Sequence, residues 1–561
     1  MIRKWKYKKS PDKDLVNSLK RELGVKNKTI DLLVQRGIVN YEMAEKYFRP
    51  KLDDLHSPFL MKNMSLAVEI LKKNIKTNKN ILIYGDYDVD GTTSISILYL
   101  FLKKITNNLY YYTPDRYSEG YGLSINGIDY AKKNKCSLII VLDCGIKALS
   151  QVEYANEKKI DTIICDHHTP GEILPNASAV LNPKQKDCNY PFKDLSACGV
   201  GFKLVQAYSE KNNIPFNSIK PFFDLLAVSI VADIVPLTGE NRIFTYYGIK
   251  QLNNDPSIGL KSLISLMKKS NAISVSDIGF FLAPRINAAG RMSHANKAVE
   301  LLIEQEISHA QNISNEINNF NLNRREIDQK ITKEASDKVP VGNKSTVVYS
   351  SHWHKGVIGI VASKLIEKYY RPTIVFTESN GLYTGSARSI KGFNIYDAIS
   401  SCAELVEQYG GHKYAAGLTV KKNNIHKFIS KFENVVCSTI DNEILTPIID
   451  IDIQLKFSEI STSFLKILKQ MGPFGPANHE PIFITKNVKI DDMPKKVGKD
   501  NTHLKLSLTH ENFSFEAIGF NMANVFNKII RHKKFDIVYQ IKENNWNGFN
   551  SIQLLLKDIK F

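Results

Sequence analysis

The sequence predicts an α/β fold whose core is a mainly parallel β-sheet covered by helices. From about residue 66, short apolar runs of strand length alternate with longer segments that carry apolar residues at helical spacing. Three of the apolar runs, over residues 81–83, 138–142 and 163–165, are followed directly by acidic residues. Strands that alternate with helices build parallel sheets. Functional side chains gather beyond the carboxyl ends of such strands, so a site is expected at that edge.

The first half of the chain gives these elements in order. Residues 224–234 are apolar at helical spacing, which places Asp233 near the end of a helix. The elements expected before it are a helix over 66–75, a strand over 81–84, an amphipathic helix over 92–105, a strand over 109–112, a helix over 128–134 and strands over 138–142 and 163–165.

The second half predicts a spacer helix, another α/β unit and a small β-barrel. Residues 295–338 contain neither Pro nor Gly, which favours one long helix. A strand over 346–349, a helix over 358–370 and a strand over 373–376 follow, and short alternating strands from about residue 448 suit a barrel. The expected divisions are a helical N-terminal region at 1–65, an α/β catalytic domain at 66–294, the connecting helix at 295–339, a smaller α/β domain at 340–440 and the barrel at 445–561.

Acidic and histidine residues occur in four short segments that suit a divalent-metal site. The segments are Asp86-Tyr87-Asp88-Val89-Asp90-Gly91, Asp143-Cys144-Gly145, Asp166-His167-His168 and Asp233. Hard carboxylates with few imidazoles favour Mg²⁺ or Mn²⁺. The first segment also fits the opening of a calcium-binding EF-hand loop, but Ile97 stands where that loop needs a Glu. A lone Asp at a strand end is usually a turn former or a helix N-cap, whereas four such segments together favour metal binding.

The triplet Asp166-His167-His168 resembles the defining motif of the DHH phosphoesterase superfamily. The flanking sequence resembles the RecJ family of bacterial single-strand-specific exonucleases, and the resemblance covers nearly the whole chain. The order and number of the matching segments make it specific. They are Gln35-Arg36-Gly37, Ser57-Pro58-Phe59-Leu60, Gly85 to Gly91, Gly120-Tyr121-Gly122-Leu123, Asn182-Pro183, Tyr190-Pro191-Phe192, Gly199 to Leu204, Pro284 to Arg291, Trp353 to Gly359, Ser386-Ala387-Arg388-Ser389, Gly410-Gly411-His412 and Ala415-Ala416-Gly417.

The resemblance implies a DHH domain, a smaller DHHA1 domain beyond the long helix, and a C-terminal OB-like barrel. It also implies two bound ions, Mn²⁺ or Mg²⁺, with Asp143 as the bridging carboxylate between them. Asp88 would serve one ion, and Asp90, His167 and Asp233 would serve the other.

Two further residues of these motifs are expected near the ions. His168 would face the scissile phosphate, and Asp86 is either a further ligand or a hydrogen-bonding partner of one. The sequence departs from the superfamily pattern at two positions. Tyr84 stands where many members have a His, and Cys144 stands where Asn usually follows the bridging Asp.

Basic and polar residues outside these motifs are candidates for substrate binding. Arg116, Ser386 and Arg388 are expected to hold the 5′-phosphate, because arginine matches phosphate geometry. His412 belongs to a motif that contacts nucleotide phosphates in DHH relatives. The residues expected to line the path of the strand are Arg285, Asn287 and Arg291.

The composition is consistent with a nucleic-acid partner. The formal net charge is +18 over 561 residues, which suits a polyanion. Abundant Lys, Asn and Ile also fit AT-rich coding, so the charge alone does not separate a nucleic-acid partner from a solvated basic surface. The seven cysteines include no C-x-x-C pair, and no apolar run approaches membrane-spanning length. A cytoplasmic monomer with reduced thiols is therefore expected, with no membrane partner.

Three functions are compatible with these residues. The first, which the RecJ resemblance implies, is a 5′→3′ single-strand DNA exonuclease that works in recombination and repair with a helicase and single-strand-binding protein. The second is a small-substrate DHH phosphoesterase acting on short oligonucleotides or cyclic dinucleotides. The third is a non-catalytic single-strand-binding scaffold. The barrel argues against the second function, and the intact ligand set argues against the third.

Overall fold

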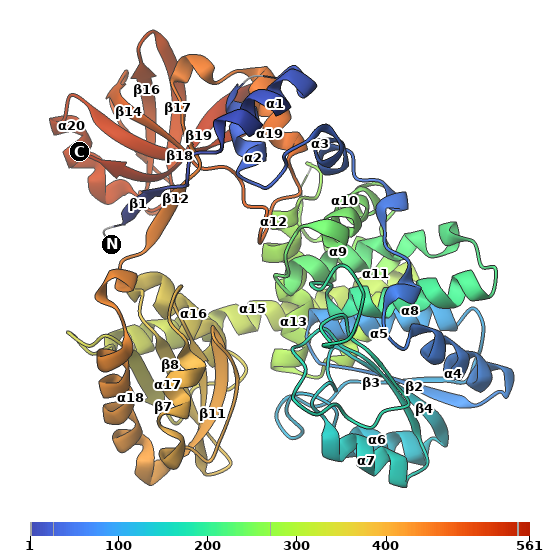
Figure 1. Cartoon of the computed structure of the whole chain (residues 1–561). Helices are drawn as coiled ribbons and strands as arrows, with labels where there is room; N and C mark the ends of the chain where they lie inside the picture. Colours follow the sequence, from blue (N-terminus) through green and yellow to red (C-terminus); the bar gives the residue numbers. More distant parts are fainter. Residues whose placement is uncertain (1–2, 26, 270, 547–548) are drawn as a thin grey trace. The chain divides into compact units, whose positions relative to one another are not determined.

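The computed structural model describes residues 3–25, 27–269, 271–546 and 549–561, without the side chains of Asn27, Trp546 and Phe549. The chain forms two compact units, shown in Figure 1. One unit contains Met1–Leu55, Pro236–Thr238 and Ile448–Phe561. The other contains His56–Val235 and Gly239–Pro447.

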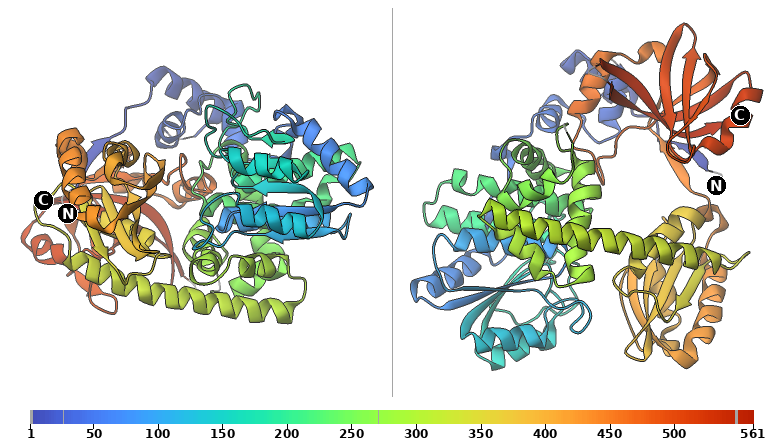
Figure 2. Two further views of the ribbon diagram at one scale, coloured as in Figure 1. Left: turned by 90° about the horizontal axis from the view of Figure 1, so that it is seen from below. Right: turned by 180° about the vertical axis from the view of Figure 1, so that it is seen from behind.

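The larger unit is built around a parallel five-stranded sheet of order β3-β2-β4-β5-β6. Helices α6 and α7 cover one face, and α4, α5 and α8 cover the other (Figures 1 and 2). The central strands are apolar along their length because both faces are buried, and the predicted α/β fold with a parallel sheet is confirmed. The elements are α4 (Met64–Lys76), β2 (Asn80–Gly85), α5 (Val89–Leu102), β3 (Leu109–Tyr112), α6 (Ile125–Lys133), β4 (Cys136–Leu142), α7 (Leu149–Glu157), β5 (Asp161–Cys165), β6 (Ala179–Leu181) and α8 (Ala197–Lys211).

A helical layer follows the sheet and packs on α5 and α8. Its most buried member is α9, in which Leu225, Leu226, Ala227 and Val228 are inaccessible to solvent. Short α12 runs through a π-helix into α13, so this stretch is one continuous rod with a widened turn. The elements are α9 (Phe223–Ala232), α10 (Gly239–Asn254), α11 (Ile258–Ser265), α12 (Val275–Asp277), the π-helix (Ile278–Leu282) and α13 (Ala283–Met292).

The prediction of one helix over residues 295–339 is wrong, because the segment forms α14 (Asn296–Ile303) and α15 (Ile307–Asp337). Glu304 leaves the helical conformation with ψ 138°. Its carboxylate accepts hydrogen bonds from the backbone N–H groups of Gln305 (2.7 Å) and Glu306 (2.9 Å). These local hydrogen bonds from a side chain to the backbone compete with the helical bonds, so the helix is broken without Pro or Gly. The remaining long helix α15 packs on α11 and α13 near its start and on α16 near its end (Figure 2).

The second sheet of the larger unit has five strands in the order β10-β11-β9-β8-β7. Only β7 and β8 are parallel, and the other pairs are antiparallel. Helix α16 covers one face with the end of α15, and α18 packs in the core on the other face. The elements are β7 (Thr346–Ser350), α16 (Ile358–Tyr369), β8 (Thr373–Ser379), β9 (Leu382–Arg388), α17 (Ile395–Ser400), β10 (Gln408–His412), β11 (Ala415–Lys421) and α18 (Ile425–Thr439).

The smaller unit contains a closed five-stranded barrel. Its strands pair in the order β14-β18-β19-β17-β16, and β16 pairs back onto β14, which confirms the predicted OB-like barrel. The elements are β12 (Ile448–Ile451), β13 (Ile453–Gln454), α19 (Thr462–Gln470), β14 (Phe483–Ile490), β15 (Lys495–Val497), β16 (His503–His510), β17 (Phe513–Gly519), α20 (Phe526–Arg531), β18 (Phe535–Trp546) and β19 (Phe549–Lys560).

The N-terminal segment belongs to the barrel unit and does not form a separate helical region over 1–65. Helices α1 (Lys13–Leu23), α2 (Asn27–Val34) and α3 (Tyr41–Phe48) bury Leu19, Ile30 and Ala44 in the same apolar core as the barrel strands. The basic start of the chain forms β1 (Lys4–Tyr7), which pairs in parallel with β12. The Trp5 indole N–H donates to the Asp558 carboxylate at 2.8 Å. This long-range partner turns a helical-looking segment into a strand.

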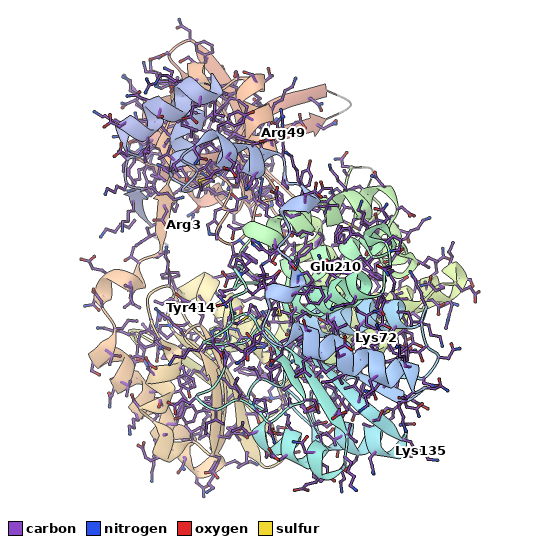
Figure 3. All side chains as sticks on the ribbon, turned by 45° about the vertical axis from the view of Figure 1, so that its right-hand side comes forward. Arg3, Arg49, Lys72, Lys135, Glu210 and Tyr414 are labelled. Atoms are coloured by element: carbon purple, nitrogen blue, oxygen red, sulfur yellow. The ribbon has the colours of Figure 1, made fainter. Side chains whose placement is uncertain are left out.

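Charged side chains project from both units, as the labelled Arg49 of the smaller unit and Lys72, Lys135 and Glu210 of the larger unit illustrate (Figure 3). The seven cysteines are free thiols, and all except Cys437 are buried. No helix in the described part of the chain combines the length and apolar character needed to cross a bilayer.

Candidate metal centre and strand-binding site

Three parallel strands deliver acidic and histidine side chains to one edge of the first sheet. Asp86 follows β2, Asp143 follows β4, and His167 lies two residues beyond the end of β5. The three strands are in register, with Gly85 beside Leu142 and Leu142 beside Cys165. The side chains just beyond the ends of these strands are therefore brought together, as the spacing of the motifs predicts.

The turn between β2 and α5 places two carboxylates at the start of the helix. Asp88 is the N-cap of α5, and its Oδ1 accepts from the Gly91 N–H at 3.1 Å. A Cβ on Gly91 would lie 2.2 Å from the Asp86 carbonyl oxygen, so no other residue fits there without a shift of the backbone. The tight turn fixes the relative positions of Asp86, Asp88 and Asp90.

Asp90 is buried, and its carboxylate accepts hydrogen bonds from three groups on two helices. Its carboxylate accepts from the backbone N–H groups of Ala197 (2.8 Å) and Cys198 (2.9 Å) at the start of α8. It also accepts from the Ser229 hydroxyl at 2.6 Å. Burial raises the pKa of Asp90 to about 6 despite these bonds. The sequence analysis missed Ser229, although it lies one helical turn before Asp233, at the spacing that shares a helix face.

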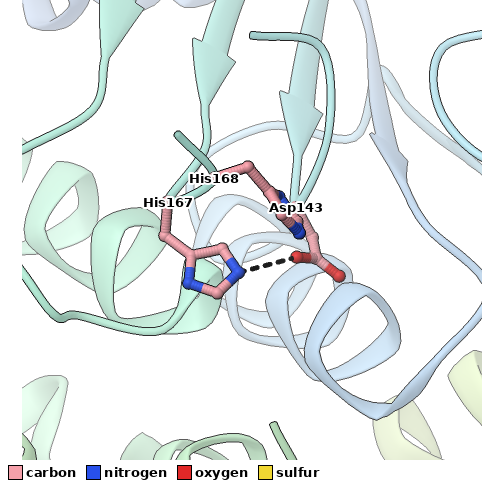
Figure 4. A group of neighbouring side chains, drawn as sticks. All are labelled: Asp143, His167 and His168. Atoms are coloured by element: carbon pink, nitrogen blue, oxygen red, sulfur yellow. Dashed lines mark ion pairs between the residues drawn. The ribbon is translucent and has the colours of Figure 1, made fainter. Parts of the chain in front are cut away.

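His167 lies at the centre of the acidic residues. Its Nε2 is 3.5 Å from Asp143 Oδ1, 3.6 Å from Asp233 Oδ2 and 3.9 Å from Asp90 Oδ2, and Figure 4 shows it facing Asp143. Burial lowers the pKa of His167 to about 3, so the imidazole is neutral near pH 7. A neutral imidazole nitrogen is the form that ligates metals.

Asp143 occupies a strained and electrostatically unfavourable position. Its φ of 63° lies in the left-handed region, which is uncommon for a residue with a side chain. Its carbonyl oxygen accepts from the Tyr121 hydroxyl at 2.9 Å. Burial, together with the negative charges of Asp88, Asp90, Asp233 and Asp86, raises the pKa of Asp143 well above its usual value. A cation in the cluster would offset this repulsion.

The donor set fits divalent cations of the Mg²⁺ and Mn²⁺ type. Buried Asp86 Oδ1, Asp233 Oδ2 and His167 Nε2 accept no hydrogen bond from any described group, although such atoms are normally satisfied. The candidate ligands form three groups of residues, and within each group the ligand atoms lie within 4.8 Å of one another. They are Asp86, Asp88 and Asp143; Asp90, His167 and Asp233; and Asp143, His167 and His168. Asp143 is shared by the first and third groups, the arrangement that a bridging carboxylate requires.

The first residue of the Asp-His-His triplet positions the other two. Asp166 Oδ1 accepts from the backbone N–H groups of His167 (2.7 Å) and His168 (3.0 Å), and Oδ2 accepts from Ile146 N–H at 3.0 Å. Burial alone would raise the pKa of Asp166, but its bond to His168 and the neighbouring charge lower it to about 2. Asp166 therefore remains ionised and is fully used in hydrogen bonding.

The two departures from the superfamily pattern both lie in the apolar layer beneath α6 and α7. Tyr84 is fully buried there, and its hydroxyl donates to the Gly122 carbonyl oxygen at 2.7 Å. Cys144 is buried in the same cluster. Neither belongs to a group of candidate metal ligands.

Three arginines converge beside the acidic cluster without a carboxylate partner. Arg116 donates to the Gly290 carbonyl oxygen at 3.0 Å and lies 3.8 Å from the Tyr87 ring centre. Desolvation and the positive charges of Arg116 and Arg388 lower the pKa of Arg291 to about 9. No ion pair is recorded for Arg116, Arg291 or Arg388 among the described residues. Three unneutralised guanidinium groups at one place suit an anion.

The second sheet contributes the remaining predicted residues. Arg388 Nη1 is 3.1 Å from the Ser386 hydroxyl, and both side chains face Gly359, where a Cβ would come within 3.1 Å of them. His412 lies on edge strand β10. Partial desolvation and the positive charges of Arg388 and His168 lower its pKa. His412 is therefore electrostatically coupled to both the arginines and the triplet.

One of the three predicted strand-lining residues on α13, Arg285, is placed differently from the other two. Asn287 and Arg291 are one turn apart and share a face, whereas Arg285 points elsewhere. Arg285 donates to Asn318 Oδ1 on α15 and to the Phe281 carbonyl oxygen, each at 3.0 Å. The structure thus gives Arg285 protein partners away from the metal ligands, while Asn287 Oδ1 is buried without a partner.

Comparison with known proteins agrees with this architecture. A family model for the DHH family, N-terminal domain matches residues 80–230, one for the DHHA1 domain matches residues 342–437, and one for the RecJ OB domain matches residues 451–558. The single-stranded-DNA-specific exonuclease RecJ of Bacillus subtilis is 36% identical, and the match covers 99% of this chain and 70% of the relative.

The chain belongs to the RecJ family. The crystal structure of RecJ in complex with Mn²⁺ from Thermus thermophilus superposes with a TM-score of 0.87 at 23% identity and covers 100% of this chain and 79% of the other. A crystal structure of exonuclease RecJ bound to manganese is 29% identical with a TM-score of 0.61, covering 70% of this chain and 97% of the other. The order of DHH, DHHA1 and OB domains expected of a RecJ protein is therefore confirmed.

Proposed function

We propose that the chain is a metal-dependent exonuclease specific for single-stranded DNA that removes nucleotides from the 5′ end. The observation that carries the proposal is the position of His167 Nε2 between three carboxylates of separate segments, Asp90, Asp143 and Asp233. RecJ-family membership supplies the substrate class. We also propose that Asp88 and Asp86 complete the ligand set on the far side of Asp143.

Divalent ions held by these residues would activate water and stabilise the attacking and leaving oxygens of an in-line displacement. The chain's own contribution is to hold the ligands rigidly. Asp90 is fixed by α8 and Ser229, and Asp166 fixes the two histidines. Since most of these contacts are to backbone, the ligand positions are set by the fold rather than by flexible side chains.

His168 is the residue proposed to contact the scissile phosphate. Partial burial lowers its pKa, but the hydrogen bond from its Nδ1 to Asp166 (2.8 Å) outweighs that effect and raises it. The His168 side chain is 45% exposed and so faces the solvent side of the cluster. A protonated imidazole there donates a charge-assisted hydrogen bond to a phosphate oxygen.

We propose that the arginine cluster sets the direction of digestion by holding the 5′ end. Arg116, Ser386 and Arg388 would hold a 5′-phosphate, and Arg291 behind them would add positive charge. His412 on β10 would contact the neighbouring phosphate, and Asn287 would line the strand path. Arg285 would contribute to strand binding only through its positive charge, because its hydrogen bonds are made to other residues of the chain.

The domains are proposed to divide this work. Residues 66–294 hold the ions, 295–339 connect the domains, 340–440 bind the strand end, and 445–561 with the N-terminal helices bind the remaining strand. The barrel follows the OB pattern, in which a groove tracks a single strand. A monomer in the cytoplasm that works with a helicase and single-strand-binding protein in recombination and repair is the proposed setting.

The test is digestion of one strand labelled at either end, with Mn²⁺, with Mg²⁺ and with chelator. The proposal expects metal-dependent release of labelled mononucleotide from the 5′-labelled strand at once, and from the 3′-labelled strand only at the end. A blunt duplex of the same sequence should resist. Preferential hydrolysis of a dinucleotide, with long strands untouched, would point to a small-substrate phosphoesterase instead.

A further inference from the structure

An aromatic side chain that nothing in the fold requires projects from the π-helix. Phe280 is 85% exposed, whereas Ile278 and Leu282 on either side of it are fully buried. The buried pair anchors the turn, so the backbone presents Phe280 outward. An exposed phenyl ring has an unfavourable hydration free energy. A π-helical turn is rare and occurs frequently at functional sites.

The π-helix packs directly on the helix that carries a metal ligand. It contacts α9, and a Cβ on Gly279 would lie 3.6 Å from Val231 Cγ1, two residues before Asp233. The residue after Asp233 is Ile234, which is 71% exposed at a φ of 60°. A β-branched residue in the left-handed region is a strained outlier. The end of α9 therefore carries one exposed apolar side chain, and the π-helix that packs on α9 carries another.

Two basic residues, Arg285 and Arg291, follow Phe280 on the helix α13 that continues from the π-helix. The Arg285 guanidinium stacks 3.3 Å from the centre of the neighbouring Phe281 ring. Desolvation and the positive charges of Arg325 and Arg324 lower the pKa of Arg285 to about 10. Arg324 is paired with Asp328 at 3.6 Å, whereas Arg285 and Arg291, which lie along α13 from the π-helix to the arginine cluster, form no ion pair among the described residues. Aromatic faces beside basic groups are the combination that single-stranded nucleic acid binds.

We propose that Phe280 is a stacking platform for one base of the bound strand, on the 3′ side of the bond that is cut. This proposal rests on the proposed function, because it takes the strand to occupy the metal centre beside Asp233. Stacking positions one nucleotide while its phosphate is held by the arginines. Since every base has a flat apolar face, the contact holds any sequence. Phe280 is thus a positioning residue that acts on affinity and register.

The experiment measures binding of a long 5′-phosphorylated strand to the full chain in chelator, where no digestion occurs. Phe280→Ala is compared with Phe280→Trp and with the control Val341→Ala, which removes a side chain that is 99% exposed at a distant loop. The proposal expects Phe280→Ala to weaken binding about tenfold, which corresponds to about 1.4 kcal/mol. Phe280→Trp should bind at least as tightly as the unaltered chain, and Val341→Ala should be unchanged.

A set of strands with one abasic nucleotide at successive positions locates the contact. When the abasic nucleotide lies at the contact position, the unaltered chain and Phe280→Ala should bind the strand equally, because the stacked base is then absent from both complexes. Equal affinity of Phe280→Ala and the unaltered chain for the intact strand would overturn the proposal. So would a constant difference at every abasic position, which would instead show that Phe280 affects binding without stacking on a base.

The two proposals fail separately. If the unaltered chain digests the strand but Phe280→Ala binds it normally, the stacking platform is wrong and the exonuclease stands. If the abasic scan shows coupling at one position but no metal supports digestion, the platform stands and the catalytic proposal is wrong. Absence of any strand binding overturns both.

Discussion

Asp166 Oδ1 lies 2.8 Å from His168 Nδ1 while it accepts the backbone N–H groups of both histidines. The carboxylate that opens the triplet is thereby committed to hydrogen bonds within the chain. It holds His167 toward the acidic cluster, while Nε2 of the partly exposed His168 lies 3.4 Å from the Tyr121 hydroxyl. The triplet is a preorganised unit in which one residue orients two others, as outer hydrogen-bond partners do around metal sites.

Asp166→Asn should lower turnover about tenfold to hundredfold, the range for loss of such an orienting partner. An amide cannot accept all of these bonds, and the loss of its charge should move the pKa of His168 downward. The pH dependence of turnover, measured with Mn²⁺, should shift to lower pH on the limb that reports His168. Asp161→Asn is a matched control, because Asp161 is an exposed carboxylate bonded to Ser178. An unshifted profile in Asp166→Asn would remove the orienting role.

The metal-free protein should gain stability as pH falls from about 7.5 to about 5, because the pKa values of three carboxylates of the cluster, Asp90, Asp143 and Asp233, are raised. Their combined gain outweighs the opposite contribution of His167, whose pKa is lowered to about 3 and which therefore costs stability below about pH 6.5. The folded-state pKa of Asp90 is about 6, above its usual 3.8, so the folded state binds the proton more tightly than the unfolded state. The contribution of Asp90 to the free energy of unfolding therefore increases as pH falls through 6, by an amount on the order of 2 kcal/mol. Asp166 has the opposite shift, to about 2, and its contribution is lost only below about pH 4.

Thermal unfolding in chelator across this pH range checks the prediction. Mn²⁺ added near pH 7.5 should raise the midpoint, because the ion replaces the proton in offsetting repulsion among the carboxylates. Asp143→Asn should raise the metal-free midpoint near pH 7.5 and remove most of the response to Mn²⁺. A metal-free midpoint that falls steadily with pH over this range would contradict the assigned direction of the shift.

Arg388→Ala and Arg116→Ala should each weaken the preference for a 5′-phosphate over a 5′-hydroxyl end. A charge-assisted hydrogen bond contributes about 1.5–3 kcal/mol, so a loss of about tenfold to hundredfold is expected. The ratio of kcat/KM for the two ends is the measurement, with Lys133→Ala, at an exposed position of α6, as a control for lost positive charge. Unaltered end preference in both arginine variants would place the pocket elsewhere.

A truncated chain should fold only if the cut leaves one of the two compact units intact. A chain of residues 56–447 retains the metal centre, so it should fold, bind Mn²⁺ and hydrolyse short strands, with weaker affinity for long ones. A chain of residues 1–447 leaves Leu19, Ile30 and Leu32 without the barrel core that buries them, so it should aggregate. Light scattering and KM on long strands test both. A soluble, monomeric chain of residues 1–447 would show that the N-terminal helices do not depend on the barrel.

Local patterns predicted the parts of the fold that depend on short-range order. The strand over 109–112 has the same limits in the structure as in the sequence analysis. The metal candidates converge because parallel strands end at one edge, a consequence of fold class alone. Long-range contacts were not predictable in this way. Trp5 becomes part of a strand through Asp558, more than five hundred residues away, and Ser229 acts on Asp90 through helix packing.

Side-chain direction explains the remaining differences. Arg285 and Arg291 are both basic and lie on one short helix, so composition gave no reason to separate them. Their spacing does, because residues six positions apart on a helix point about 120° away from one another. The expected helix breaks at Glu304 because the carboxylate of this residue accepts from the backbone N–H groups of Gln305 and Glu306, which charge and helical propensity do not reveal.

The central claim is that the buried acidic cluster binds the ions that drive hydrolysis of a single strand. One titration tests it most directly: turnover of a 5′-phosphorylated single strand against Mn²⁺ concentration, for the unaltered chain and for Asp143→Asn with its folding confirmed. Metal binding by this cluster predicts saturable activation of the unaltered chain and a loss of at least a hundredfold in the variant at any Mn²⁺ concentration. Near-normal turnover by Asp143→Asn, or Mn²⁺-independent turnover by the unaltered chain, would contradict it.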